Sequence, residues 1–240
     1  MKKLFALITL AVSMCSTTVA FASASIEDTI AKGVSNYQTT IDVSSCNATP
    51  EQVVTVFKTM FNTNPVMFDL DGTIQCAYSG QKASSITVGY INTPAEANKV
   101  KEIMNSIAAQ AKTKTTVVEK AKFVHDYLIN HSEYDYTLNS KTMYDLLING
   151  KGNCGSYALS FKDAMDKLGI ECTVVLTDDL SHCWNQIKID GKWYNVDVTW
   201  DENYSINGTA DSTLFMKSDS YFKVTGHKTR KSVNLCNVDK

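Results

Sequence analysis

The sequence predicts an α+β fold, in which a helix that carries a cysteine packs on an antiparallel sheet and a smaller α+β segment precedes this core. Apolar residues recur at helical spacing in several segments, two of which open with the pair Thr-Pro. Short turns join the strand-like segments, which favours antiparallel pairing because parallel strands need a long crossover. The chain has 240 residues, 44% of them hydrophobic, which is enough for one sizeable core or two small ones.

The first 24 residues, MKKLFALITLAVSMCSTTVAFASA, have the pattern of a secretory signal peptide. Two lysines precede an apolar run that is too short to span a bilayer, and small residues allow cleavage after Ala22 or Ala24. Met14 stands where a lipoprotein signal needs a small residue, which argues against a lipid anchor at Cys15. No later segment is long and apolar enough to cross a membrane. We therefore expect a secreted protein, extracellular or associated with the cell surface, with no membrane contact after cleavage.

The charge of the remaining chain disfavours a nucleic-acid partner. After residue 24 there are 21 basic and 25 acidic residues, so the net charge is −4. Arg230 is the only arginine, and the bidentate grip on phosphate that such partners usually require is therefore not available.

Residues 25–114 are predicted to form the smaller segment, made of helices and a meander of strands. Thr49 is suited to cap a helix that has proline in its first position, and the same pattern recurs at Thr93. Asp71-Gly72 is predicted to be a two-residue turn between antiparallel strands. Helices are predicted over residues 26–34, 49–61 and 93–112, and strands over residues 40–44, 66–70, 73–79 and 84–91.

The motif Asp69-Leu70-Asp71-Gly72-Thr73 raises a competing hypothesis, because it resembles the nucleophile motif of haloacid-dehalogenase-type phosphatases. That chemistry needs a further acidic pair at the end of a later parallel strand. The pair Asp178-Asp179 runs directly into the next strand without a helix between them, so it belongs to an antiparallel hairpin. The sequence therefore disfavours a phosphatase.

The C-terminal region, residues 115–240, contains the most informative segment. A helix is predicted from Thr115 to His131, and a second one begins at Cys154, with Asn153 as its N-cap and Gly169 at its C-terminal end. The unpaired N–H groups and the positive dipole end of a helix N-terminus favour a thiolate. Cys154 is therefore a candidate nucleophile.

The predicted hairpin around Asp190-Gly191 supplies partners for this cysteine. A two-residue turn makes Ile189 face Lys192, and the same register carried to the strand ends makes His182 and Asp197 diagonal neighbours on one face. Asn185 points to the other face. Cys154, His182 and Asp197 then form a nucleophile, a base and an orienting carboxylate, which is the arrangement for acyl transfer through a thioester. The backbone N–H of Cys154 is a natural oxyanion donor, and the sequence identifies no second one.

The segment from Gly150 to Asn203 resembles the transglutaminase-like core of the papain-type cysteine enzymes. The shared pattern is a cysteine that opens a helix after glycine, then His-x-Trp-Asn at 182–185, then Trp-Tyr-x-Val-Asp-x-Thr-Trp at 193–200. The resemblance covers about half of the chain and is strongest to secreted bacterial members. It implies a papain-like transglutaminase core, a catalytic triad of Cys154, His182 and Asp197, no cofactor or metal, and a protein or peptide substrate, with cell-wall peptides as one option. Alanine is usual where Cys183 stands.

Three functions remain open at this point. The thioester can pass to an amine, which would cross-link proteins, or to water, which would make the chain a cysteine peptidase or amidase. A catalytically silent cell-surface binding module is the third, and the intact triad argues against it. The alternative interpretation of Cys154 is that it forms half of a disulfide, since an even number of cysteines in a secreted protein favours disulfides. Six cysteines after residue 24 allow fifteen full pairings, and Cys46–Cys76 and Cys172–Cys183 are candidate bridges.

Other polar and aromatic side chains have simpler interpretations. His125 and His131 are expected to be solvated positions near a helix end, because no cluster with metal-ligand spacing surrounds them. Trp184 and Trp193 pack the hairpin or line an acyl-binding cleft. No acidic loop has a calcium-binding spacing.

Overall fold

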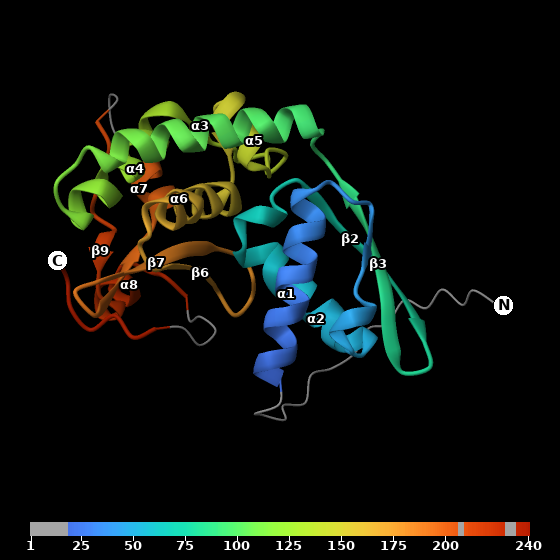
Figure 1. Cartoon of the computed structure of the whole chain (residues 1–240). Coiled ribbons are helices and arrows are strands. Elements are labelled where there is room, and N and C mark those ends of the chain that lie inside the picture. Colours follow the sequence, from blue (N-terminus) through green and yellow to red (C-terminus); the bar gives the residue numbers. More distant parts are fainter. Residues whose placement is uncertain (1–18, 206–208, 229–233) are drawn as a thin grey trace.

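The computed structural model of the chain describes residues 19–205, 209–228 and 234–240 and has two α+β parts side by side (Figure 1). Each part has its own apolar core, one formed by residues between 26 and 88 and the other by residues between 100 and 216. No helix within these described ranges is long and apolar enough to cross a membrane. Helices packed on antiparallel sheets confirm the predicted α+β class.

The N-terminal part packs helices against a three-stranded sheet of strand order β1-β3-β2. Thr49 caps α2, and its hydroxyl accepts the backbone N–H of Gln52, as the Thr-Pro pattern predicts. The predicted signal peptide lies largely outside the described residues, which begin at Val19. The elements are α1 (Val19–Ser35), β1 (Thr40–Asp42), the 3₁₀ turn Ser44–Cys46, α2 (Pro50–Thr63), the 3₁₀ turn Pro65–Met67, β2 (Leu70–Ser79) and β3 (Lys82–Tyr90).

The predicted turn at Asp71-Gly72 is wrong, because β2 runs through it as one strand. Leu70 pairs with Tyr90 and Ile74 with Val88, so the strand bulges between these two pairs. Gly72 has a φ of 83°, and this left-handed conformation explains why the dipeptide looked like a turn. The hairpin bend lies later, between Ser79 and Lys82. Strand β1 completes the sheet by pairing with the other edge of β3.

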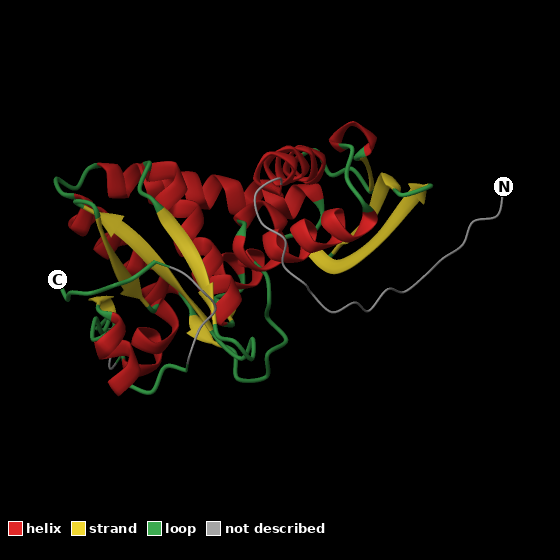
Figure 2. Cartoon of the chain, turned by 90° about the horizontal axis from the view of Figure 1, so that it is seen from below, coloured by secondary structure: helices red, strands yellow, loops and turns green. Residues whose placement is uncertain are grey.

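The C-terminal part is layered, with α6 between the pair α3–α4 and a four-stranded antiparallel sheet of order β6-β7-β8-β9 (Figure 1). Figure 2, seen from below, shows the strands of this sheet in front of the helices that pack on its far face. The elements are α3 (Pro94–Lys112), α4 (Val117–His131), β4 (Glu133–Tyr134), α5 (Met143–Ile148), β5 (Lys151–Gly152), α6 (Cys154–Leu168), β6 (Cys172–Leu176), β7 (Cys183–Ile189), β8 (Lys192–Val196), α7 (Val198–Tyr204), β9 (Phe215–Lys217) and α8 (Asp219–Val224).

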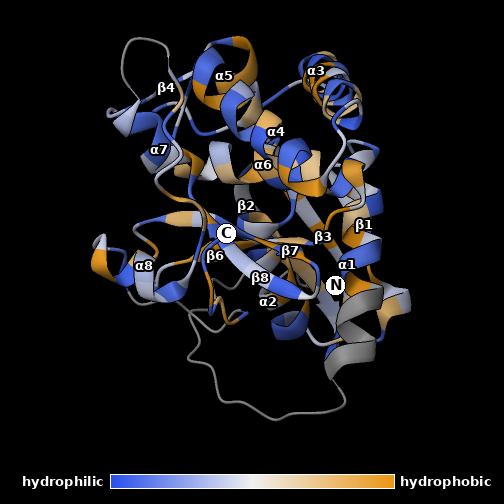
Figure 3. Ribbon diagram, turned by 90° about the vertical axis from the view of Figure 1, so that its left-hand side faces the viewer, coloured by the Kyte–Doolittle hydropathy of each residue, from blue (hydrophilic) through white to orange (hydrophobic). Residues whose placement is uncertain are grey.

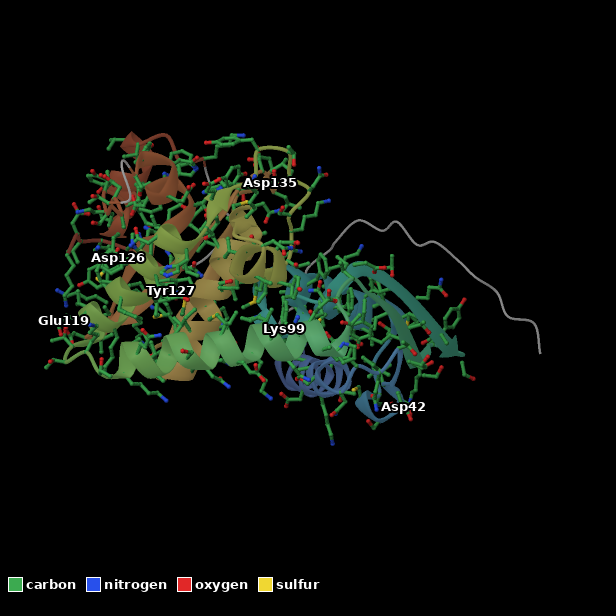
Figure 4. All side chains as sticks on the ribbon, turned by 90° about the horizontal axis from the view of Figure 1, so that it is seen from above. Asp42, Lys99, Glu119, Asp126, Tyr127 and Asp135 are labelled. Carbon is green, nitrogen blue, oxygen red and sulfur yellow. The ribbon has the colours of Figure 1, made fainter. Side chains whose placement is uncertain are left out.

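Helix α3 extends along both parts (Figure 4). It carries both hydrophobic and hydrophilic residues (Figure 3). The exposed face includes Lys99. The buried face belongs to the C-terminal core, although the sequence places this helix in the N-terminal segment. The side chains of this face that join that core are Val100, Met104, Ile107 and Ala111.

The predicted register of the β7–β8 hairpin is confirmed from Ile189↔Lys192 to Asn185↔Val196. One face packs on α6, where the Asn185 amide donates to the Ala158 carbonyl at 3.0 Å. The other face is also covered, because α8 and the C-terminal segment pack over it. There the Trp184 indole N–H donates to Asn195 Oδ1 at 3.0 Å. Trp184 is only 2% exposed, so it packs the hairpin and lines no cleft.

The expectation that His125 is solvated is wrong, whereas His131 is exposed as predicted. The His125 side chain is fully buried between two carboxylates, with Nδ1 2.9 Å from Asp126 and Nε2 3.0 Å from Asp201. Asp126 follows it on α4 (Figure 4), and Asp201 lies on α7. Burial alone would lower the pKa of His125, but the hydrogen bonds and charges of both carboxylates raise it. This buried contact joins α7 to α4.

Removing this imidazole should destabilise the protein strongly. His125→Ala is expected to lower the free energy of unfolding by about 3–5 kcal/mol, because it leaves the carboxylate of Asp201 buried without its charged partner. The matched control is His131→Ala on the same helix, which should stay within about 0.5 kcal/mol because that side chain is exposed. Urea unfolding at pH 7 measures both, and equal effects of the two variants would contradict the prediction.

Candidate active site

Cys154 is the first residue of α6, as the sequence predicts. The Asn153 side chain caps this helix by accepting the Ser156 N–H at 3.1 Å, which leaves the Cys154 N–H in the unpaired first turn. Gly152 precedes the cap in a crowded position, since an added Cβ would lie 2.2 Å from the Ser156 hydroxyl. Glycine is therefore needed to bring the chain close to the helix start and to place the half-buried thiol there.

His182 stands directly before β7, at the end of a tight loop held by Thr177. The Thr177 N–H donates to the His182 carbonyl at 3.0 Å, and the His182 N–H donates to the Thr177 hydroxyl at 3.1 Å. Nε2 of His182 is 2.6 Å from Asp197 Oδ2. Cys154 acts on the same ring, because its interaction with the imidazole raises the pKa of His182. Because Asp197 occupies Nε2, the nitrogen that remains for the sulfur is Nδ1.

Asp197 reaches His182 by a route other than the predicted one. The ladder ends at Val196, and Asp197 is the N-cap of α7, where Oδ1 accepts the Trp200 N–H at 3.1 Å. The β7–β8 register that was predicted to continue to His182 and Asp197 therefore does not extend that far. Capping fixes the carboxylate with no solvent exposure, so that Oδ2 points at the imidazole. The structure thus brings Cys154, His182 and Asp197 together.

His227 completes the cluster and has no role in the sequence interpretation. Its Nε2 lies 2.9 Å from the same Oδ2 of Asp197, and its side chain is 2% exposed. The ring lies 4.0 Å from the Trp200 ring and 4.1 Å from the Phe222 ring, measured between centroids. The only sequence signal is a histidine that ends the segment LFMKSDSYFKVTGH, to which the resemblance extends, because no strand register places it.

The charges in the site favour an ionised pair of thiolate and imidazolium. Hydrogen bonds from Cys183 and His182 and the charge of His182 outweigh burial and lower the pKa of Cys154 to about 5. Burial alone would lower the pKa of His182, but the charge of Asp197 and its hydrogen bond raise it to about 10. Against its own burial, the pKa of Asp197 is lowered to about 2, chiefly by His182. Between pH 5 and 10 the nucleophile is therefore ionised beside a proton donor.

A second cysteine, Cys183, acts on the nucleophile, because its interactions with Cys154 are the largest cause that lowers the pKa of the Cys154 thiol. Cys183 is 7% exposed, and its own pKa is raised by the contact with Cys154 and by burial. The residue that departs from the usual alanine of the resembling family therefore influences the ionisation of the nucleophile.

The disulfide interpretation of Cys154 is wrong in this structure, where it is a free thiol. The suggested Cys172–Cys183 bridge is absent as well. Both of these cysteines are free, and they stand at opposite ends of the β6–β7 pair, where Cys172 faces Ile187 and Cys183 faces Leu176. Cys76 is also free, so it forms no bridge with Cys46.

Within the described part of the chain, one group of side chains has the arrangement of a possible metal site. The group consists of His182, Asp197 and His227, whose ligand atoms lie within 4.8 Å of one another. These atoms already satisfy each other, because Nε2 of both imidazoles bonds Oδ2 of Asp197. Hydrogen bonding accounts for the arrangement, and the expectation that the site uses no metal or cofactor stays a prediction.

Residues 101–198 match the family model described as the transglutaminase-like superfamily. This range contains Cys154, His182 and Asp197. Residues 101–198 form a transglutaminase-like core. Two curated relatives are the kyphoscoliosis peptidases of Mus musculus, 23% identical over 125 residues, and Homo sapiens, 23% identical over 141 residues. The matches cover 44% and 50% of this chain, and the chain spans only about a fifth of either relative, 19% and 21%.

Solved structures that resemble this chain include a TGase, with 16% sequence identity and a TM-score of 0.41 over 68% of this chain and 55% of that one. Another is the periplasmic domain of TgpA from Pseudomonas aeruginosa bound to ethylmercury, with 12% identity and a TM-score of 0.35 over 50% and 57%.

Proposed function

We propose that the chain is a secreted thiol enzyme that transfers acyl groups from amide bonds of proteins or peptides through a thioester on Cys154. The observation that carries this proposal is the position of His182, whose Nε2 is held by Asp197 at 2.6 Å and whose imidazole interacts with Cys154 at the start of α6. The match of residues 101–198 to the transglutaminase-like superfamily model supports it. The substrate class and the acceptor are part of the proposal.

The proposed cycle uses each residue for one step. The Cys154 thiolate attacks the amide carbonyl carbon, and the oxyanion that forms accepts the unpaired backbone N–H of Cys154. Protonated His182 gives its proton to the leaving nitrogen, so the C–N bond breaks and a thioester remains. Neutral His182 then takes a proton from an incoming amine or water, which attacks the thioester and releases the thiolate. Asp197 stays ionised and keeps the imidazole oriented.

The identity of the acceptor separates the two enzyme hypotheses. Hydrolysis is the second candidate, and the names of the curated relatives favour it, since both are peptidases. The test incubates the protein with a casein-like acceptor and a fluorescent amine, and measures both labelled product and new amino termini. Amine incorporation supports the transferase, and new termini without incorporation support the peptidase. If neither product appears and the protein binds cell walls, the binding module replaces both.

Selective alkylation should detect the ionised nucleophile without any substrate. At pH 6 iodoacetamide is expected to modify Cys154 before the other cysteines, because its thiolate forms above a pKa of about 5, whereas burial raises the pKa of Cys76. The rate should fall as the pH drops through 5 and should also fall in His182→Ala. Peptide mass mapping identifies the modified cysteine, and faster modification of Cys76 would contradict the proposal.

His227 is proposed as a positioning residue that holds Asp197 behind His182. His227→Ala should lower kcat roughly tenfold with KM unchanged, because a buried hydrogen bond to the carboxylate is lost away from the substrate. His227→Gln retains an N–H donor and should recover most of kcat. Steady-state kinetics on whichever amide substrate is turned over gives both values. An equal loss in both variants would contradict this role.

Export is proposed from the signal-peptide pattern of residues 1–24. Expression of the full chain in a bacterial host should release a product that starts at Ser23 or Ser25, as intact-mass measurement of the culture fluid would show. A full-length product confined to the cells would contradict export.

A further inference from the structure

A cavity of about 650 Å³ lies where the two parts of the chain meet, away from the candidate active site. Its wall is formed by the end of α1, the segment between α2 and β2, the N-terminal half of α3, the start of α5 and the last third of α6. On α6 the first lining residue is Asp163, which follows Cys154 by nine positions and therefore lies roughly 13 Å along the helix from it. The proposed acyl transfer leaves this cavity unused.

Asp69 gives this cavity a buried carboxylate. It is the first residue of the Asp-Leu-Asp-Gly-Thr motif and is only 4% exposed. Its Oδ1 accepts an amide N–H of Asn92 at 2.8 Å, whereas the Tyr37 hydroxyl, on the same wall, donates to the Thr93 carbonyl at 3.3 Å. Within the described chain no hydrogen bond reaches Oδ2, and this atom is not one of the fully enclosed side-chain oxygens that lack a partner. Oδ2 is therefore accessible from the cavity.

The carboxylate of Asp69 lacks a positive partner, unlike the other carboxylates of the cavity wall. Asp163 pairs with Lys167 at 3.2 Å, and Asp166 pairs with Lys162 at 2.8 Å. Among the described residues no lysine or histidine forms an ion pair with Asp69, and burial raises the pKa of its carboxyl group. A buried charge without a counter-charge is costly. A cationic ligand in the cavity would balance it.

The shape and chemistry of the wall narrow the class of ligand. Because Asn92 occupies Oδ1, the carboxylate offers one free oxygen, which suits the point charge of an ammonium better than a guanidinium that grips both oxygens. The cavity has the size of small-molecule sites, and buried apolar side chains of Val100, Met104 and Met143 also line it. We propose that this cavity binds a small amphipathic primary amine, whose ammonium group donates to Oδ2 of Asp69 and whose apolar body packs against these side chains.

Isothermal titration calorimetry of the full chain with phenethylamine tests this site. Phenethyl alcohol is the matched probe, because it has the same ring and chain but a hydroxyl in place of the ammonium group. It should bind at least roughly tenfold more weakly, since a hydrogen bond between two charged groups is replaced by one with a neutral donor. No acyl donor is present, so the amine is not consumed at Cys154 and the result does not depend on amide turnover.

The variant Asp69→Asn keeps an oxygen that accepts from Asn92 and removes the charge. It should bind phenethylamine at least roughly tenfold more weakly than wild type does. Asp166→Asn is the matched control, because its carboxylate lines the same cavity but is exposed and already paired with Lys162. The affinity of this control for phenethylamine should stay within about twofold of wild type.

A second variant tests the cavity with Asp69 intact. Ala97 is half-buried on the α3 side of the wall, so Ala97→Phe should fill the cavity and abolish binding even if Asp69→Asn disturbs the fold. Circular dichroism of each variant is compared with that of wild type. Equal affinities for the amine and the alcohol, unchanged amine affinity in folded Asp69→Asn or Ala97→Phe, or no binding of phenethylamine by wild type would overturn the proposal.

Discussion

Cys154→Ala is expected to lower kcat/KM on amide substrates by about 10⁴-fold or more, since no thioester can form without the sulfur. The fold should not change, because the side chain is half-buried and alanine is well tolerated in a first helical turn whose cap is Asn153. The measurement is the rate of amide turnover with far-ultraviolet circular dichroism of both proteins as the control for folding.

Cys154→Ser gives a second comparison at the same position. Serine keeps the size and a hydrogen-bonding atom, but its hydroxyl is far less acidic than a thiol whose pKa is lowered to about 5. It should therefore lose almost as much rate as alanine. Turnover in either variant within tenfold of wild type would show that the chemistry lies elsewhere in the chain.

Asp197→Asn is expected to reduce kcat by roughly 10³–10⁴-fold, because a neutral amide neither stabilises the imidazolium nor fixes its tautomer. Asparagine is as good an N-cap as aspartate, so the bond to the Trp200 N–H and helix α7 should be retained. The substitution therefore separates the two tasks of this side chain.

The pH dependence gives the matching readout for this variant. In wild type the charge of Asp197 keeps His182, the proton donor, protonated up to a pH of about 10. With asparagine this support is lost, so the alkaline limb of the kcat profile should move to lower pH. Denaturant unfolding serves as the control, and Asp197→Ala, which also removes the cap, should be less stable by about 1 kcal/mol. An unchanged alkaline limb in Asp197→Asn would argue against the proposed role.

Local sequence patterns predicted the elements that depend on local chemistry. Thr49, Thr93 and Asn153 each cap the helix that the sequence assigned to them, and Gly169 ends α6 in a left-handed conformation at φ 70°. These positions were predictable because a cap needs only its own side chain and a backbone N–H two or three residues away. The register of the β7–β8 hairpin followed from its turn for the same reason.

Predictions that depended on distant partners did less well. The histidine His125 looked solvated because nothing near it in the sequence shows that Asp201, 76 residues later, closes over it. His227 was missed because α8 brings it to Asp197 from a segment without register information. The meeting of His182 and Asp197 was predicted from a strand that in fact ends one residue too early. The N-cap position of Asp197 on α7 places its carboxylate beside His182, so the predicted pair forms although the predicted strand does not reach it.

Helix α3 sets a limit on how the chain can be divided. A fragment that starts at Thr115, where the sequence suggested a seam, would lack Val100, Met104, Ile107 and Ala111, all of which fill the interior behind α6. Such a fragment would expose the hydrophobic surface that α3 covers and would aggregate. A fragment that starts at Asn92 would keep α3 and its Thr93 cap. A fragment that contains the C-terminal part alone should therefore begin near Asn92, before α3, and not at Thr115.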